Sequence, residues 1–200
     1  MNNNLVITIS RQYGSGGREL AQILAEKLQV KLYDKQIVHM AAMQLSLGEL
    51  SEAELLKMES KLSPLPLSAL MPFHSFGLHF GESSTQMFLE EAEVIRKLAE
   101  HSCIILGRAA DYVLRNNPNK FSIFVCANDE FRTQRGIDNY GGKSLRELNK
   151  EDAQRASYYN YYTGKTWGAG ESYDLIVNTS TKPLEKIADA IIDYLKKFNS

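Results

Sequence analysis

The sequence predicts an α/β protein in which helices cover both faces of a parallel sheet. Short β-branched segments alternate with segments that repeat hydrophobic side chains at helical spacing, and this alternation is typical of a parallel sheet. A cluster of glycines lies where the first predicted strand gives way to the first predicted helix. The 200 residues, 44% of them hydrophobic, are enough for one domain with one substantial core.

The predicted strands are short, largely apolar segments. Leu5–Ser10 has branched side chains, no turn residues and a glycine turn after it, which is typical of a buried strand. In parallel sheets, ligands bind beyond the carboxyl ends of the strands, and both the glycine turn and the Gly107-Arg108 pair fall there. The predicted strands are Leu5–Ser10, Val30–Tyr33, Cys103–Leu106, Phe121–Ala127 and Tyr173–Val177.

The segments between the strands carry the helical period. The first helix places Leu20, Ile23 and Leu24 on one face, and polar side chains on the other. Ser63–Ser84 holds three of the five prolines, so we expect an irregular insert there. The predicted helices run from Arg18, from about Lys35 to Met43, from Leu47 to Leu62, from about Gln86 to His101, from about Asp129, and from Leu184 to Phe198.

Composition argues against several classes of partner. The net charge is −1 and acids and bases are mixed along the chain, so no overall field attracts nucleic acid or an anionic membrane. We expect no signal peptide, because the first residues lack a basic start and a long apolar stretch, and no segment is apolar enough to predict a bilayer span. Cys103 and Cys126 lie in apolar runs, where buried free thiols are expected and a disulfide or metal site is not. A cytoplasmic protein is the resulting expectation.

The glycine turn has the features of a phosphate cradle. Gly14, Gly16 and Gly17 lie between a strand and a helix, where backbone N–H groups can converge on phosphate oxygens and the helix dipole favours an anion. Arg11 and Arg18 flank the turn and carry positive charge. The alternative is a turn whose glycines serve only backbone geometry.

Three better-known motifs do not fit this turn. A dinucleotide fingerprint would need its third glycine at Glu19, and a nucleophile elbow around Ser15 would need glycine at Tyr13. The standard P-loop would place lysine at Gly17 and a magnesium-binding hydroxyl at Arg18. The anion site must therefore work without the usual lysine.

The segment Ile7–Ala21, ITISRQYGSGGRELA, resembles the opening of the cytidylate kinase-like proteins. The resemblance covers most of the chain and implies a three-layer P-loop kinase fold, with an acceptor-binding insert at about residues 35–85 and a lid at about 136–170. Further segments that resemble this family, in the same order, are Tyr33–Lys35, Ile104–Asp111, Phe124–Arg135, Lys150–Tyr159 and Asp174–Ser180.

The resemblance implies phosphoryl transfer from ATP, with Mg²⁺, to a nucleoside monophosphate or a related small acceptor. Asp34 is then expected to orient the acceptor or a magnesium-bound water, and Arg108 to hold the phosphate or base of the acceptor. The donor phosphates are assigned to Arg11, Gly14, Ser15, Gly16, Gly17, Arg18 and Glu19. The predicted catalytic residues are Arg18 and three arginines of the lid region, Arg132, Arg135 and Arg155.

Each assignment has a structural alternative. Asp34 could cap the next helix, Arg108 could form a structural ion pair, and arginines on exposed helices are usually just solvated. The aromatic run Tyr158–Tyr162, followed by Trp167, could stack a base, pack a lid hinge or belong to the core. The Phe-rich insert could cover the acceptor or form a subunit contact in a homo-oligomer.

Two departures from the family pattern leave the function open. Cytidylate kinases carry an aspartate directly after the Gly-Arg pair, where this chain has Ala109, and Gly17 stands in place of the lysine. A nucleoside monophosphate kinase, a kinase for a non-nucleotide acceptor, and a catalytically weak nucleotide- or phosphate-binding module therefore all remain candidates.

Overall fold

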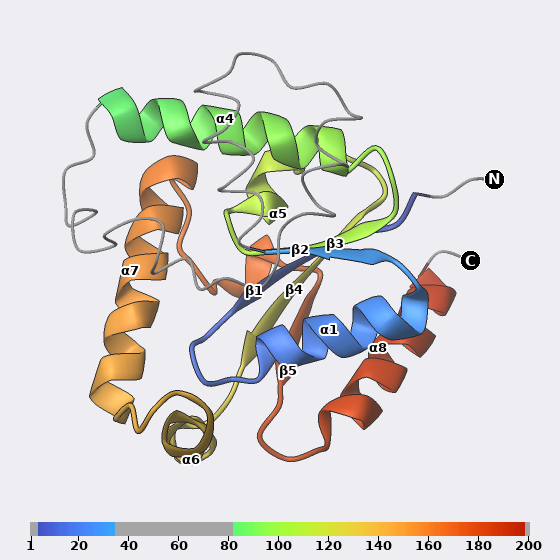
Figure 1. Ribbon diagram of the computed structural model, residues 1–200. Helices are drawn as coiled ribbons and strands as arrows, with labels where there is room; N and C mark the ends of the chain where they lie inside the picture. Colours follow the sequence, from blue (N-terminus) through green and yellow to red (C-terminus); the bar gives the residue numbers. More distant parts are fainter. Residues whose placement is uncertain (1–3, 35–81, 199–200) are drawn as a thin grey trace. The chain divides into compact units, whose positions relative to one another are not determined.

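The computed structural model describes residues 4–34 and 82–198 (Figure 1). The predicted helices at Lys35–Met43 and Leu47–Leu62, and nearly all of the predicted insert, lie outside these residues. The described elements are β1 (Val6–Arg11), α1 (Gly17–Leu28), β2 (Lys31–Tyr33), α4 (Glu82–Leu98), β3 (Cys103–Leu106), α5 (Ala110–Val113), β4 (Lys120–Cys126), α6 (Asp129–Asn139), α7 (Leu145–Thr163), the 3₁₀ turn η3 (Gly170–Ser172), β5 (Leu175–Asn178) and α8 (Leu184–Phe198).

The strands form a five-stranded parallel sheet in the order β2-β3-β1-β4-β5, which confirms the predicted fold class. β1 lies in the middle, and its Ile7 is level with Ile104 of β3 and Phe121 of β4. Because the neighbouring strands run in the same direction, their carboxyl ends share one edge. The glycine turn after β1 therefore lies at the centre of that edge.

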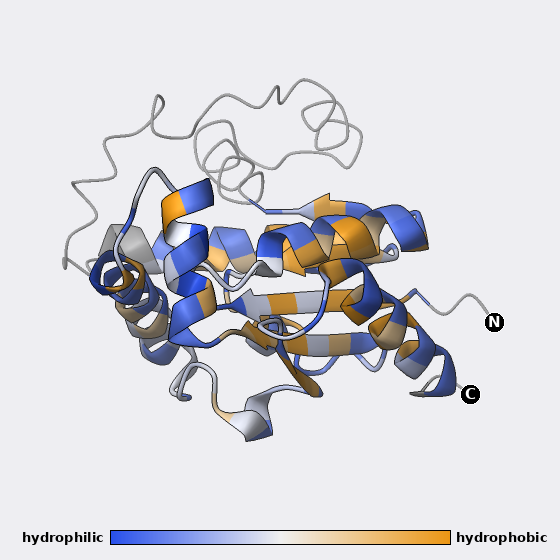
Figure 2. Cartoon of the chain, turned by 90° about the horizontal axis from the view of Figure 1, so that it is seen from below, coloured by the Kyte–Doolittle hydropathy of each residue, from blue (hydrophilic) through white to orange (hydrophobic). Residues whose placement is uncertain are grey.

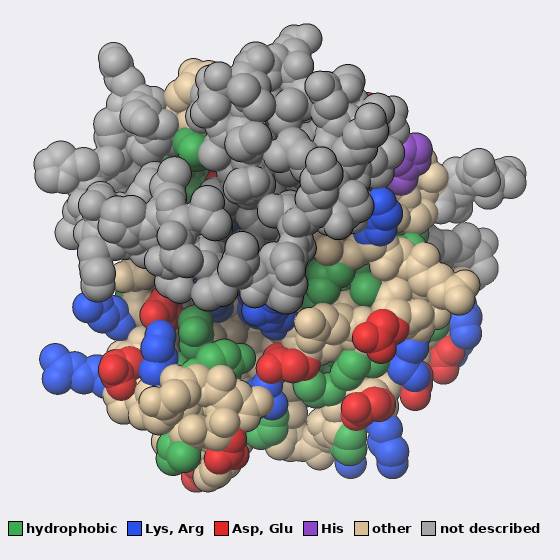
Figure 3. All heavy atoms as spheres, in the orientation of Figure 1, with side chains coloured by type: hydrophobic (Ala, Val, Ile, Leu, Met, Phe, Trp, Pro, Cys, Tyr) green, Lys and Arg blue, Asp and Glu red, His purple; other side chains and the backbone are tan. Residues whose placement is uncertain are grey.

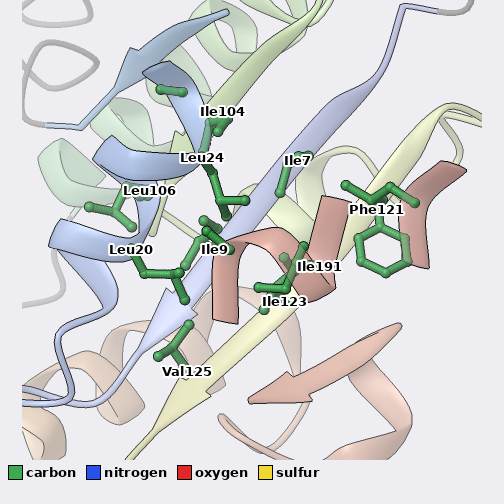
Figure 4. Packing of buried hydrophobic residues seen from close by; sticks show 14 residues of the cluster. Ile7, Ile9, Leu20, Leu24, Ile104, Leu106, Phe121, Ile123, Val125 and Ile191 are labelled. Atoms are coloured by element: carbon green, nitrogen blue, oxygen red, sulfur yellow. The ribbon is translucent and has the colours of Figure 1, made fainter. Parts of the chain in front are cut away.

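The main core lies between the sheet and the helices α1 and α8 (Figure 4). Ile7 and Ile9 of β1 point to this side and are at most 1% exposed. They pack with Leu20 and Leu24 of α1 and Ile191 of α8. Burying each such side chain contributes about 1.5–3 kcal/mol. In Figure 2, hydrophobic residues alternate with hydrophilic ones along the helices and dominate the strands, as the predicted periodicity requires.

The opposite face of the sheet is covered by α5 and α7. α5 contacts β1 and β4, and Tyr159 of α7 donates a hydrogen bond to Asp111 of α5. The four residues of α5 were not predicted, because one helical turn is too short to show a hydrophobic period. α7 begins at a capping box, in which Ser144 and Glu147 each bond the other's backbone N–H.

Two compact units make up the chain, residues 1–32 with 101–200 and residues 33–100. Within the second unit, α4 buries Ala92, Val94 and Ile95, which keep the helical period. The single domain with an insert at about 35–85 stays a prediction. So does the lid, although α6 and α7 cover most of residues 136–170.

The surface and the thiols agree with the composition. Basic and acidic side chains are interspersed over the described surface in Figure 3, and no helix of the described residues combines the length and apolar character that crossing a membrane requires. Cys103 and Cys126 are not joined in a disulfide; Cys103 is buried, as predicted, whereas Cys126 is only partly buried. Burial raises the pKa of the Cys103 thiol to about 12, so this thiol stays protonated at neutral pH.

Candidate functional site

The glycine turn has the backbone geometry of an anion cradle. Gly14 and Gly16 have φ angles of 80° and 75°, in the left-handed region that favours glycine. Gly16 is the N-cap of α1 and provides no side-chain cap, so no cap side chain occupies the first amides of this helix. These amides and the positive end of the helix dipole are suited to bind phosphate oxygens.

Ser15 supports the turn from inside. Its side chain is fully buried and its hydroxyl donates to the carbonyl of Gln12 at 2.8 Å. Thr179, just after β5, donates its hydroxyl to the Ser15 carbonyl at 2.6 Å. The Gln12 side chain in turn accepts from the Ala127 amide at 3.1 Å. These bonds attach the turn to the ends of β4 and β5.

A buried ion pair clamps the residue before the first glycine. Asp152 accepts a hydrogen bond from the Tyr13 amide at 2.7 Å, and Arg132 donates to the Tyr13 carbonyl at 2.9 Å. Arg132 and Asp152 are joined at 2.6 Å, with the arginine only 3% exposed. Burial raises the pKa of Asp152, while the Tyr13 amide and the neighbouring guanidinium groups act against this shift. Arg132, predicted as catalytic, is therefore placed to position the turn.

The other two lid-region arginines also contact the turn. Arg135 pairs with Glu19 at 2.6 Å, in the first turn of α1. The second carboxylate oxygen of Glu19 and Nε of Arg135 are buried without a hydrogen-bond partner. Arg155 donates from Nη1 to the Arg11 carbonyl at 2.8 Å, and its guanidinium lies 4.9 Å from the ring centre of Tyr13. The structure thus brings all three predicted arginines to the cradle, and their catalytic role stays a prediction.

The predicted acceptor residues follow neighbouring strands. Gly107, Arg108 and Ala109 have φ angles of 81°, 58° and 51°, so three consecutive residues after β3 are left-handed. Such a conformation costs a non-glycine residue about 1–2 kcal/mol, and strain of this kind is found at binding sites. The Arg108 guanidinium lies 5.8 Å from the ring centre of Tyr158. Asp34 directly follows β2 and is half-buried; its acceptor role stays a prediction.

The remaining predicted donor residue, Arg18, is exposed in the first turn of α1. Among the described residues, no three His, Cys, Asp or Glu side chains group into a metal site.

The aromatic run divides into inward and outward side chains. Tyr158, Tyr161 and Tyr162 form a ladder with ring centres 4.9 Å apart at each step. Tyr159 instead is 3% exposed and donates to Asp111 at 2.7 Å. Trp167, which is partly buried, packs edge-on against the buried Phe124 at 5.2 Å. The tyrosines of α7 point in different directions because successive residues of a helix are rotated by about 100°.

Sequence reasoning missed the buried Asp111–Tyr159 pair. Asp111 is 6% exposed, and its second oxygen is buried without a hydrogen-bond partner. Burial raises the pKa of Asp111, although the Tyr159 hydroxyl acts in the opposite direction. Burial and the neighbouring carboxylate also raise the pKa of Tyr159. The missed signal was the position of Tyr159, four residues after Arg155 and seven after Asp152, the two α7 residues that bond the backbone at the glycine turn.

We predict that Asp111→Asn stabilises the protein at neutral pH. The folded state raises the Asp111 pKa, so it binds more protons than the unfolded chain, and the wild type loses stability as pH rises through the range between the two pKa values. Asparagine has no such titration and still accepts from Tyr159. Urea unfolding between pH 3 and 8 measures the free energy of unfolding of both proteins. The variant should be the more stable one, and the difference should grow from acid to neutral pH. Asp193→Asn, at a site 70% exposed, is the control; a gap that shrinks with rising pH would contradict the assignment.

Comparison with known proteins supports the resemblance found in the sequence. The model of the cytidylate kinase-like family matches residues 6–181. No curated protein matches the chain at a significant level.

Three solved structures share the fold over nearly their whole length. A structure described as an uncharacterized protein from Eubacterium ventriosum has a TM-score of 0.72 and 24% identity, covering 96% of this chain and 98% of that one. Shikimate kinase from Acinetobacter baumannii, in complex with shikimate, has a TM-score of 0.55 and 12% identity, covering 98% and 95%. Shikimate kinase from Bacteroides thetaiotaomicron has a TM-score of 0.55 and 13% identity, covering 96% and 98%. At these identities the likeness concerns the fold.

Proposed function

The chain belongs to the cytidylate kinase-like family, and from this we propose that it transfers a phosphoryl group from ATP to a small acceptor, with a nucleoside monophosphate as the first candidate. The observation that carries the proposal is the left-handed glycine turn after the central strand, which leads into a helix with no side-chain cap. We place this activity in the cytoplasm, where ATP is available. A homo-oligomer is compatible with the proposal but is not required by it.

The residues of the turn fit the phosphates of ATP. The amides from Gly14 to Glu19 would hold the donor phosphates, and the left-handed conformations of Gly14 and Gly16 let the backbone curve around them. Mg²⁺ in phosphoryl transfer neutralises charge that develops on the phosphates. Arg18 stands where a P-loop has its metal-binding hydroxyl, so substrate phosphates and water would be the main ligands of the ion.

The protein's part in the reaction is to position groups and to stabilise charge. Asp152 and Arg132 hold the backbone of Tyr13 at the start of the turn. The Arg135–Glu19 pair holds its end, where α1 begins. Arg108, at the end of β3, would bind the anionic group of the acceptor. Such preorganised cations and amides act without reorganisation during the reaction.

A non-nucleotide acceptor is the second candidate. Ala109 stands where cytidylate kinases carry an aspartate, and its methyl side chain has no donor or acceptor for a hydrogen bond to a cytosine. One structure of similar fold is a shikimate kinase in complex with shikimate. Shikimate therefore belongs among the acceptors to be tested.

A coupled assay of ADP release tests the proposal. We expect that one or more of CMP, dCMP, UMP, AMP, GMP and shikimate accelerates ADP release from Mg²⁺ and ATP above the rate without acceptor. If the protein binds ATP but no acceptor accelerates ADP release, the third candidate, a nucleotide- or phosphate-binding module, is favoured. The argument for that candidate is that Gly17 stands in place of the P-loop lysine. If calorimetry shows binding of neither ATP nor ADP, both the kinase and the nucleotide-binding module are refuted.

A further inference from the structure

We propose that Arg11 supplies the bridging positive charge that a P-loop lysine supplies elsewhere, and that Gly17 is a glycine because the Arg11 side chain occupies the space beside it. This inference rests on the proposed function and deepens it, since it names the cation that links the donor and acceptor sides of the site.

The first observation is the contact between Arg11 and Gly17. Arg11 is the last residue of β1, and Gly17 is the first residue of α1. A Cβ added at Gly17 would lie 2.6 Å from Cβ and 3.1 Å from Cγ of Arg11. The base of the arginine side chain therefore lies directly against the helix start. The Cβ atom has little freedom to move aside, because the backbone of Arg11 is paired with Val125 of β4.

The second observation concerns the other end of the same side chain. A Cβ added at Gly107 would collide with Nη1 of Arg11. The side chain thus runs from the start of α1 to the backbone at the end of β3. Its guanidinium lies beside the residue that precedes Arg108, on the acceptor side of the proposed site.

The first of these contacts explains the departure at Gly17. The left-handed glycines of the turn are Gly14 and Gly16, whereas Gly17 is helical, a conformation that any residue adopts. Its lack of a side chain is a matter of space. A lysine cannot be placed there while Arg11 is present, and the arginine brings a permanent charge to the same region.

The orientation of Arg11 is also fixed through its backbone. Its carbonyl accepts from Arg155 at 2.8 Å, and its residue is paired with Val125 of β4. A cation held in this way can contact the oxygens of the transferred phosphoryl group as charge develops on them. Losing such a group lowers the rate by about 10²-fold.

Two charge variants at position 11 form the main test. Arg11→Met keeps the apolar stem and removes the charge, and we expect it to stay folded while ATP affinity and the rate of ADP release with the best acceptor together fall by about 10²-fold. Arg11→Lys keeps a charge on a shorter side chain and should retain more of both. If Arg11→Met matches the wild type within threefold, the inference is overturned.

Two double variants test the shared space. Arg11→Gly with Gly17→Lys removes the Arg11 side chain and leaves Val125 Cβ, at 3.2 Å, as the remaining tight neighbour of the new Cβ. Activity should recover at least tenfold over Gly17→Lys alone. Arg11→Ala with Gly17→Lys keeps the Cβ that blocks the lysine, and should stay as poor as Gly17→Lys. Equal activity of the two folded double variants, checked by thermal unfolding, would overturn the inference. Should no acceptor accelerate ADP release in the wild type, the proposed function fails, while ATP affinity of the Arg11 variants still decides whether Arg11 binds the nucleotide.

Discussion

Arg132→Met is expected to lower the free energy of unfolding by about 3–5 kcal/mol, which is typical of breaking a buried ion pair by removing one partner. The Asp152 carboxylate would remain buried after losing the guanidinium that lies 2.6 Å away. The Tyr13 carbonyl would lose its donor as well. A domain of this kind is stable by only about 5–15 kcal/mol, so the loss is large. Urea unfolding at pH 7 measures it.

Two further variants separate the ion pair from the rest of the clamp. Arg132→Met combined with Asp152→Leu should recover much of the stability, because two apolar side chains can replace a buried pair at little cost. ATP affinity should not recover with it, since the Tyr13 amide and carbonyl still lack their partners. Arg146→Met on exposed α7 surface is the matched control and should change stability little. A cost below about 1 kcal/mol for Arg132→Met would mean that the pair does not stabilise the turn.

The fold was predictable because its signals are local. Strands such as Cys103–Leu106 are buried on both faces, so they stand out in the sequence as unbroken runs of apolar residues. The long amphipathic helix at the end of the chain, α8, was located at Leu184–Phe198 as predicted. Strand ends differ by one or two residues, as at β1, which extends to Arg11. Such ends depend on pairing with neighbours, which the local sequence does not contain.

The roles of the arginines were not predictable in the same way. Arg132 and Arg135 lie three residues apart on α6 and look alike in sequence. One is buried because Asp152, twenty residues later, and the Tyr13 carbonyl provide acceptors. Only the folded chain brings these partners together, so the fully buried Arg132 and the partly buried Arg135 could not be told apart beforehand.

The same reasoning applies to the space around the turn. The sequence showed that Gly17 departs from the P-loop pattern, but the cause is a side chain six residues earlier, at the end of β1. The left-handed conformations of Arg108 and Ala109 had no sequence signal either, because neither residue type favours them. Both features depend on tertiary packing around the edge of the sheet.

Gly16→Val is expected to lower ATP affinity by about 10²-fold or more while the fold persists. Gly16 has φ of 75°, a conformation in which a β-branched residue is a steric outlier. An added Cβ would not clash, because its nearest neighbours are two Leu184 side-chain atoms, at 3.4 and 3.5 Å, and the Arg135 guanidinium carbon, at 3.7 Å. Relief of the strain must therefore come from rotating the backbone, which turns the amides of the cradle away from the phosphates. Calorimetric titration with ATP and Mg²⁺ measures the loss.

The chain provides a control with the same backbone strain outside the turn. Gly164, just after α7, has φ of 67°, and no atom would lie within 4 Å of an added Cβ. Valine at either position should cost about 1–2 kcal/mol of stability, so thermal unfolding should respond similarly to both variants. Only Gly16→Val should impair nucleotide binding, because only its amides face the proposed donor site. If the two variants bind ATP equally well, the glycine turn does not bind phosphate, and its left-handed residues have a structural role alone.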